Sequence, residues 1–141
     1  PFFETKDLED STLTYTPESL KGKVYLIDFW ATWCGPCVEA LPDLQKIYDS
    51  FKHKGFTILS ISADEHAEKI HAFRKKRWAM SWMHTMLRNG LKDPLAVAFV
   101  VIDLPKAILV DENGIILAGH ADLNKEGLRA ILDRHFGIEK K

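Results

Sequence analysis

The only two cysteines of this 141-residue chain stand in the stretch WATWCGPC, residues 30–37. A pair such as Cys34 and Cys37 can form a structural disulfide, contribute two ligands to a metal ion, or act as a redox reagent that alternates between dithiol and disulfide. A disulfide across so short a loop adds little stability in the chain-entropy model. A closed zinc site needs further ligands, and the histidines offer no second CxxC or HxxxH array. The spacing therefore favours the redox reagent over the staple and the metal site.

The segments on either side of the cysteines must position them. Residues 23–30, KVYLIDFW, are β-branched and aromatic and predict a buried strand. After the cysteines, apolar residues recur at three- and four-residue steps, which predicts an amphipathic helix. These residues are Val38, Leu41, Leu44, Ile47, Tyr48 and Phe51. Pro42 lies inside this helix and is expected to kink it.

Cys34 therefore falls at the end of a strand and the start of a helix. Unpaired backbone N–H groups and the helix dipole favour negative charge there, so the thiol ionises more easily. The thiolate is the species that attacks a disulfide. Cys37, one turn into the helix, faces the same way and can resolve the mixed disulfide. Gly35 allows the tight turn, and Pro36 suits the first helical turn, where its missing N–H is not needed.

Asp28 places a carboxyl group in the middle of the predicted buried strand. Burial of such a group is unfavourable unless it has a partner or a task. One interpretation is a locally hydrogen-bonded structural residue, or a strand exposed on that face. The other is a proton acceptor behind the dithiol, since a strand that runs into a turn can bring its carboxyl beneath the cysteines. Desolvation would raise its pKa towards neutrality, where a general base works best.

The rest of the chain alternates between strand and helix patterns, which predicts an α/β fold with a mixed sheet. Asn113-Gly114 between apolar runs is a strong hairpin signal. The other expected elements are a short strand at 12–15, a strand at 56–62 after a stop at Gly55, and a helix capped by Asp64 that runs to about residue 77. They continue with a strand or helical turn at 82–87, a short helix at 94–99 opened by Asp93, and a closing helix ended by Gly137.

Composition and charge bound the function. The chain is 46% hydrophobic and 28% charged, as expected for a globular domain. Its 19 basic and 20 acidic residues give no field of one sign, so nucleic acid is not an expected partner. No apolar run approaches the roughly 18 residues of a spanning helix. Because the chain begins with Pro1, we expect a processed N-terminus, and a membrane tether through a removed segment stays open.

The stretch LIDFWATWCGPC resembles the active site of thioredoxin-fold proteins. The wider pattern LKGKVYLIDFWATWCGPCVEALP resembles the extracytoplasmic thiol:disulfide oxidoreductases typified by TlpA and ResA. Further on, LPKAILVDENGIILAGH resembles the cis-proline, strand, turn and strand of that family. The resemblance covers about residues 20–136. It implies a thioredoxin fold, α/β, with a mixed central sheet flanked by helices and an N-terminal strand extension. We expect one thioredoxin-like domain, 1–141, with the extension at 1–20 and the core at 20–137.

Carried over to this sequence, the resemblance implies Cys34 as the nucleophile and Cys37 as the resolving thiol. Asp28 matches the buried carboxylate of the family. Pro105 matches the cis-proline that faces the dithiol, and Leu104 offers its backbone to a bound substrate.

Trp33, with Gly35 and Pro36, is expected to contact the substrate beside the dithiol. No cofactor or metal is implied.

Three positions depart from the family pattern. Thioredoxins place a lysine on the next strand near the buried carboxylate, where this chain has Ser60, so the pKa of Asp28 should be higher. Relatives often carry a glutamate where this chain has Ala40, and Glu39, one residue earlier, is expected on a solvated helix face. Lys106 follows the proline and either points to the thiolate or is exposed.

Two further features have simpler explanations. Residues 74–77, RKKR, read as a solvated helix end favoured by the helix dipole. Residues 78–86 hold an unusual group of tryptophans and methionines. Core packing is the default for them, and a groove for a partner protein is the alternative.

These observations predict a monomeric thiol:disulfide oxidoreductase that reduces protein disulfides and is recharged by a thiol electron donor. The resemblance places it outside the cytoplasm, in the periplasm. The Gly-Pro between the cysteines matches thioredoxin, a reductant with a potential of about −270 mV. A thiol peroxidase of the same fold is an alternative, although the proline of a peroxidatic motif is missing upstream of Cys34. A non-enzymatic metal- or partner-binding module is another.

Overall fold

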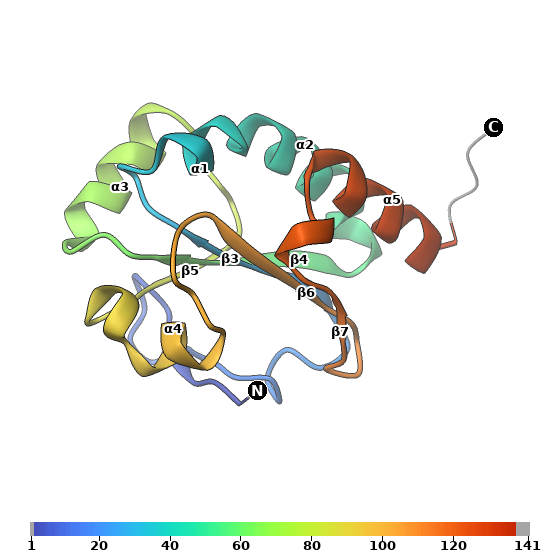
Figure 1. Cartoon of the computed structure of the whole chain (residues 1–141), viewed down its shortest axis with the longest axis horizontal. Helices are drawn as coiled ribbons and strands as arrows, with labels where there is room; N and C mark the ends of the chain where they lie inside the picture. The colour runs from blue at the N-terminus through green and yellow to red at the C-terminus, as the bar shows by residue number, and fades with distance from the viewer. Residues whose placement is uncertain (1, 138–141) are drawn as a thin grey trace.

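The computed structural model describes residues 2–137. Its centre is a five-stranded mixed sheet in the order β5-β4-β3-β6-β7, in which β3, β4 and β5 are parallel and β6 and β7 antiparallel to their neighbours (Figure 1). The strands are β3 (Val24–Trp30), β4 (Phe56–Ser62), β5 (Met83–Met86), β6 (Lys106–Val110) and β7 (Ile116–Ala118). The predicted mixed α/β sheet is confirmed, and the segment at 82–87 forms a strand.

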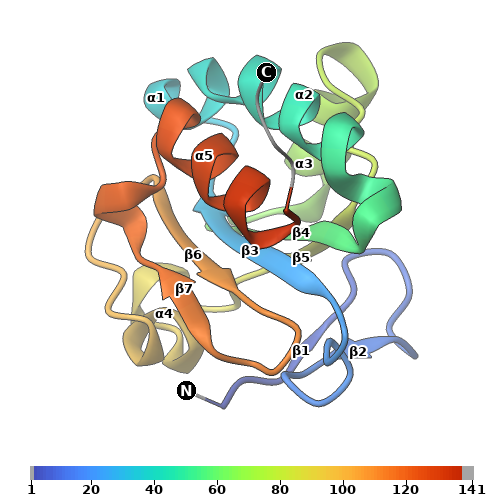
Figure 2. The same ribbon diagram turned by 90° about the vertical axis from the view of Figure 1, so that its right-hand side faces the viewer.

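Helices cover both faces of this sheet. One face carries α1 (Gly35–Glu39), α2 (Leu41–Phe51), α3 (Ala67–Lys76) and α5 (Lys125–His135), as Figures 1 and 2 show. The other face carries α4 (Pro94–Ala98) and the N-terminal strands β1 (Thr5–Lys6) and β2 (Thr14–Tyr15). Short 3-10 turns complete the path: η1 (Lys52–Lys54), η2 (Gly90–Lys92) and η3 (His120–Asp122). Within residues 2–137, no helix is long and apolar enough to cross a membrane.

The side chains of β3 alternate between two cores because successive residues of a strand face opposite sides. Leu26 and Trp30 join the core beneath α1, α2, α3 and α5, which also contains both cysteines. Ile27 and Phe29 join the core beneath α4 and the N-terminal segment. Asp28 shares the face of Leu26 and Trp30, and this alternation therefore directs its carboxyl towards the cysteine side of the sheet.

The helix after the cysteines differs from the expected single kinked helix. It is divided at Ala40 into α1 and α2, and Pro42 occupies the first turn of α2. A proline in a first turn loses no hydrogen bond, whereas inside a helix it would break one. The division lets α1 aim its own start at Cys34 while α2 packs along the sheet.

Most other expected boundaries are confirmed. Gly55 ends η1 at φ +94°, and Asp93 caps α4 by accepting the N–H of Leu95. In the β6–β7 hairpin, Gly114 has φ +81°, and Asp111 Oδ1 accepts the N–H groups of Asn113 and Ile115. The group at 78–86 packs into the cores, as the default interpretation predicted. Met80 and Trp82 are buried in the core that contains the cysteines, and Trp78 and Met86 pack against that core. Met83 packs against the core on the other face of the sheet.

The N-terminal segment covers the edge of β5. Strand β2 confirms the expected short strand, whereas β1 was not anticipated. The N–H of Leu8 donates to the carbonyl of His84, and Thr85 Oγ1 donates to the carbonyl of Lys6. The first bond satisfies a backbone carbonyl of β5 that an open edge strand would expose, and the second joins a β5 side chain to the backbone of β1. The expected domain boundary at residue 20 stays a prediction, and residues 1 and 138–141 of the expected domain lie outside the described part.

Candidate active site

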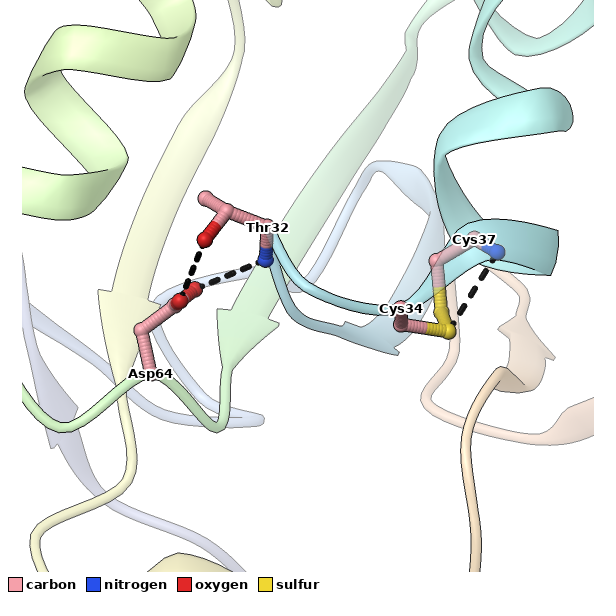
Figure 3. Close-up of a disulfide and its surroundings, with 4 residues drawn as sticks. All are labelled: Thr32, Cys34, Cys37 and Asp64. Carbon is pink, nitrogen blue, oxygen red and sulfur yellow. Dashed lines mark hydrogen bonds between the residues drawn. A yellow bond between two sulfur atoms is a disulfide. The ribbon is translucent and has the colours of Figure 1, made fainter.

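Cys34 and Cys37 are joined by a disulfide at the start of α1. Their Cα atoms are 5.3 Å apart, and both residues are buried. Cys34 is the N-cap of α1, and its Sγ accepts the backbone N–H of Cys37 at 3.3 Å (Figure 3). A sulfur at this position receives a helix N–H that has no partner inside the helix, and that interaction strengthens when the sulfur is a thiolate. The local geometry therefore favours an ionised Cys34 after reduction.

The carboxylate of Asp64 holds the loop that leads from β3 to Cys34, a role that the sequence did not predict. Asp64 was expected to cap the next helix, and this prediction is wrong, because the N-cap of α3 is His66. The buried Asp64 carboxylate instead accepts the N–H of Thr32 at 3.0 Å and its hydroxyl at 2.5 Å (Figure 3). Ser62 Oγ donates to the same carboxylate at 2.6 Å. The end of β4 thus fixes the backbone just before Cys34.

Asp28 lies in the middle of β3 and lines a cavity of about 120 Å³. The cavity walls come from β3, α2, β6, η3 and α5 and are mostly apolar: Leu26, Ala40, Leu44, Ile47, Pro105, Ala107, Leu123 and Leu128, with Asp43 and His120 among them. Desolvation raises the pKa of the Asp28 carboxyl to about 7. No hydrogen bond reaches this carboxyl from any residue between 2 and 137. A locally hydrogen-bonded structural residue, one of the two interpretations, does not fit this environment.

The strand beside Asp28 supplies no cation. Register pairs Asp28 with Ser60 on β4, the position that carries lysine in the thioredoxin pattern. The Ser60 hydroxyl accepts the indole N–H of Trp82 at 2.8 Å. Because a neutral side chain stands there, no ammonium group offsets the desolvation of the carboxyl, as the sequence predicted.

The peptide bond between Leu104 and Pro105 is cis. Pro105 lines the same cavity as Asp28, and Leu104 packs against the core that contains the two cysteines. Lys106, the next residue, pairs with Phe29 near the end of β3. The ammonium of Lys106 donates to the carbonyl of Val100 at 3.3 Å, so this contact directs it towards the loop that precedes β6.

The remaining predicted residues flank the disulfide on its solvent side. Trp33, directly before Cys34, is 67% exposed. Gly35, Pro36 and Glu39 are also exposed, which is consistent with a solvated position for Glu39. The predicted substrate-contacting residues before and within the CxxC pair are therefore accessible.

His120 is a site residue that sequence reasoning did not single out. Its Nδ1 accepts the N–H of Ala107 at 3.1 Å, and its side chain lines the Asp28 cavity. An acceptor role for Nδ1 leaves the proton of the neutral ring on Nε2. Nothing in the sequence pattern predicts this, because it depends on how η3 packs beside β6. Across residues 2–137, no cluster of three or more His, Cys, Asp and Glu side chains could hold a metal.

A CxxC pair at a helix start, a carboxyl on the same side of the sheet and a cis-proline before β6 are features of a thioredoxin-fold protein with a dithiol–disulfide site. Residues 22–116 match the family described as Thioredoxin-like, and the chain belongs to that family. The predicted resemblance and fold are therefore confirmed.

The relatives carry consistent names. Thiol-disulfide oxidoreductase ResA of Bacillus thuringiensis subsp. konkukian is 30% identical over 125 residues, which cover 83% of this chain and 64% of that protein. The chain thus spans less than two thirds of the length of this relative. Among solved structures, a thiol-disulfide oxidoreductase from Bacteroides fragilis has a TM-score of 0.81 at 28% identity, covering 96% of this chain and 97% of that one. A thiol:disulfide interchange protein from Bacteroides sp. has a TM-score of 0.82 at 30% identity, covering 100% and 90%.

The desolvated carboxyl of Asp28 predicts a distinct pH dependence of stability. In the unfolded chain Asp28 titrates at its ordinary pKa of 3.8, and in the folded chain at about 7. Between these values the folded state binds more protons, so the free energy of unfolding falls as pH rises and levels off above 7. The amide side chain in Asp28→Asn does not titrate, so this variant does not lose stability through residue 28 as pH rises. Its stability relative to wild type should rise by about 4 kcal/mol from pH 4 to pH 8, measured by urea unfolding.

The exposed Asp122 provides the control for this measurement. Asp122→Asn should show a difference from wild type that hardly changes with pH. A difference between Asp28→Asn and wild type that is equally constant would contradict the assignment of a raised pKa to Asp28.

Proposed function

We propose that this protein is a thiol:disulfide oxidoreductase that reduces disulfides in other proteins. The observation that carries the proposal is the Cys34–Cys37 disulfide at the start of α1, on the side of the sheet where Asp28 lines a cavity. The names of the relatives ResA and the Bacteroides oxidoreductase support the same activity. A merely structural disulfide would not require a desolvated carboxyl on the same side of the sheet.

The proposed reaction begins with the reduced protein. The thiolate of Cys34 attacks one sulfur of the substrate disulfide, forms a mixed disulfide and releases the other substrate sulfur as a thiolate that takes a proton from water. Asp28, ionised, then takes the proton of Cys37 through water in the cavity. The Cys37 thiolate attacks Cys34 Sγ, and the second substrate sulfur leaves as a thiolate that takes the proton held by Asp28, again through water. The substrate has gained two electrons and two protons, and the protein holds the Cys34–Cys37 disulfide until a thiol donor reduces it.

Two groups are proposed to hold the substrate. The exposed indole of Trp33 offers an apolar surface beside Cys34, together with Gly35 and Pro36. The backbone of Leu104, next to the cis-proline Pro105, offers hydrogen bonds to an extended substrate segment. Such main-chain bonds position a polypeptide irrespective of its side chains.

The proposed partners and cellular location are those of the related thiol:disulfide oxidoreductases. We propose a protein disulfide substrate and a separate thiol donor as partners, and an extracytoplasmic, periplasmic location. A monomer is the expected state, and a tether beyond the chain stays a prediction.

Single-cysteine variants test the activity. Cys37→Ala should retain the attack by Cys34 but not the release, so it should accumulate a mixed disulfide with insulin used as a protein disulfide probe. Cys34→Ala is the matched control and should accumulate none, because it lacks the proposed attacking thiolate. Non-reducing electrophoresis and mass spectrometry measure the adduct. Equal adducts with both variants, or none with either, would refute the proposed roles.

The direction of electron flow is tested by the reduction potential of the Cys34–Cys37 pair. Equilibration in dithiothreitol or glutathione buffers, read by thiol alkylation, should give a value near that of thioredoxin, about −270 mV. A potential near that of strong oxidants, about −120 mV, would reverse the proposed direction while leaving the site in place.

A further inference from the structure

Three β-branched apolar side chains are exposed within six residues at the end of α4 and in the segment that follows it. Val97 is 63%, Val100 65% and Ile102 81% exposed, and we refer to these three as the apolar strip. Between them, Phe99 and Val101 are buried in the core that contains the N-terminal segment. The segment is therefore anchored, and the exposure of the strip is not a consequence of a loose loop.

A valine is also unusual at position 100 because of the backbone conformation there. Val100 has φ +55°, in the left-handed region that is unfavourable for a β-branched residue. Val100 ends α4. Its N–H donates to the carbonyl of Val97, and the N–H of Val101 donates to the carbonyl of Ala96. This pair of bonds is a Schellman motif, in which glycine or asparagine normally takes the left-handed position. Either residue would end the helix with less strain, so the fold alone does not explain a valine there.

Val100 and Ile102 of the strip lie in the segment that leads from α4 to the end of the sheet nearest the dithiol. Strands β6 and β3 are antiparallel, and Lys106 pairs with Phe29, so the segment before β6 reaches the end of the sheet where β3 leads to Cys34. Figures 1 and 2 show this segment climbing from α4 towards the end at which α1 begins. The bond from Lys106 Nζ to the carbonyl of Val100 ties the strip to the first residue of β6. Ile102 is separated from the cis-proline Pro105 by only two residues.

We propose that the apolar strip binds the polypeptide segment beside the substrate disulfide, so that the protein selects disulfides flanked by bulky apolar side chains. The inference rests on the proposed function, because the occupant is the protein that becomes covalently attached to Cys34. Its segment must pass this end of the sheet during the mixed-disulfide state. Exposed apolar groups that are rigidly held gain from contact with apolar partners without a large loss of conformational freedom.

Matched peptides test the preference. Two synthetic peptides, each with one intramolecular disulfide, differ only in having leucine or serine at the two positions next to one cysteine. The reduced wild-type protein should reduce the leucine peptide about tenfold faster, the usual discrimination of one apolar contact. Val100→Asn and Ile102→Ser should each lower this ratio, and the double variant should bring it close to one. Ile115→Ser is the control, since Ile115 is 60% exposed in the β6–β7 turn at the opposite end of β6.

Further measurements distinguish a failure of the proposed role of the strip from a failure of the proposed function. Reduction of hydroxyethyl disulfide should be unchanged in all variants, because it is too small to reach the strip. Val100→Asn should melt at or above the temperature of wild type, and a lower value would overturn the strain argument. Equal rates on the two peptides, or a preference that survives in the double variant, would overturn the role of the strip alone. A wild-type protein that reduces neither the peptides nor hydroxyethyl disulfide would overturn the proposed function and this inference with it.

Discussion

A carboxyl group set in a mostly apolar cavity on the cysteine side of the sheet is the constraint on which the rest of this site depends. Raising the pKa of Asp28 from 3.8 to about 7 corresponds to about 4 kcal/mol against its ionised form. The sheet and helices must supply that free energy, since β3, β6, α2 and α5 all contribute walls to the cavity. In return the carboxyl can accept and release a proton near neutral pH. The absence of a cation at Ser60 is part of the same arrangement.

Much of this arrangement is predictable from local patterns. The β-branched runs that became β3 and β4 are long and apolar enough to fix their own conformation, and β4 has the predicted bounds of Phe56–Ser62. Asn113-Gly114 specifies the hairpin because glycine adopts the positive φ at little cost. The position of Asp28 within an apolar strand indicated a buried carboxyl, and the CxxC pair before a helical pattern indicated its chemistry.

The contacts of Asp64 and His120 that were missed join segments that are separated in the chain. Asp64 was predicted to cap a helix from its place after a strand, but two donors from the Cys34 loop and Ser62 compete for the same carboxylate. His120 reaches the cavity only because η3 packs beside β6. The left-handed Val100 contradicts its residue type, so no propensity could have indicated it. Such features depend on tertiary packing, which local sequence patterns do not encode.

The rate at which Cys37 releases a substrate from Cys34 tests the central claim most directly. A mixed disulfide formed on Cys34 with a chromogenic thiol would be followed by stopped-flow absorbance between pH 5 and 9, in wild type and Asp28→Asn. The account predicts a rate that rises with an inflection near the Asp28 pKa of about 7. In Asp28→Asn this inflection should be lost and the rate should fall by about a hundredfold, as expected for a missing general base. Identical rates and pH profiles in the two proteins would contradict it.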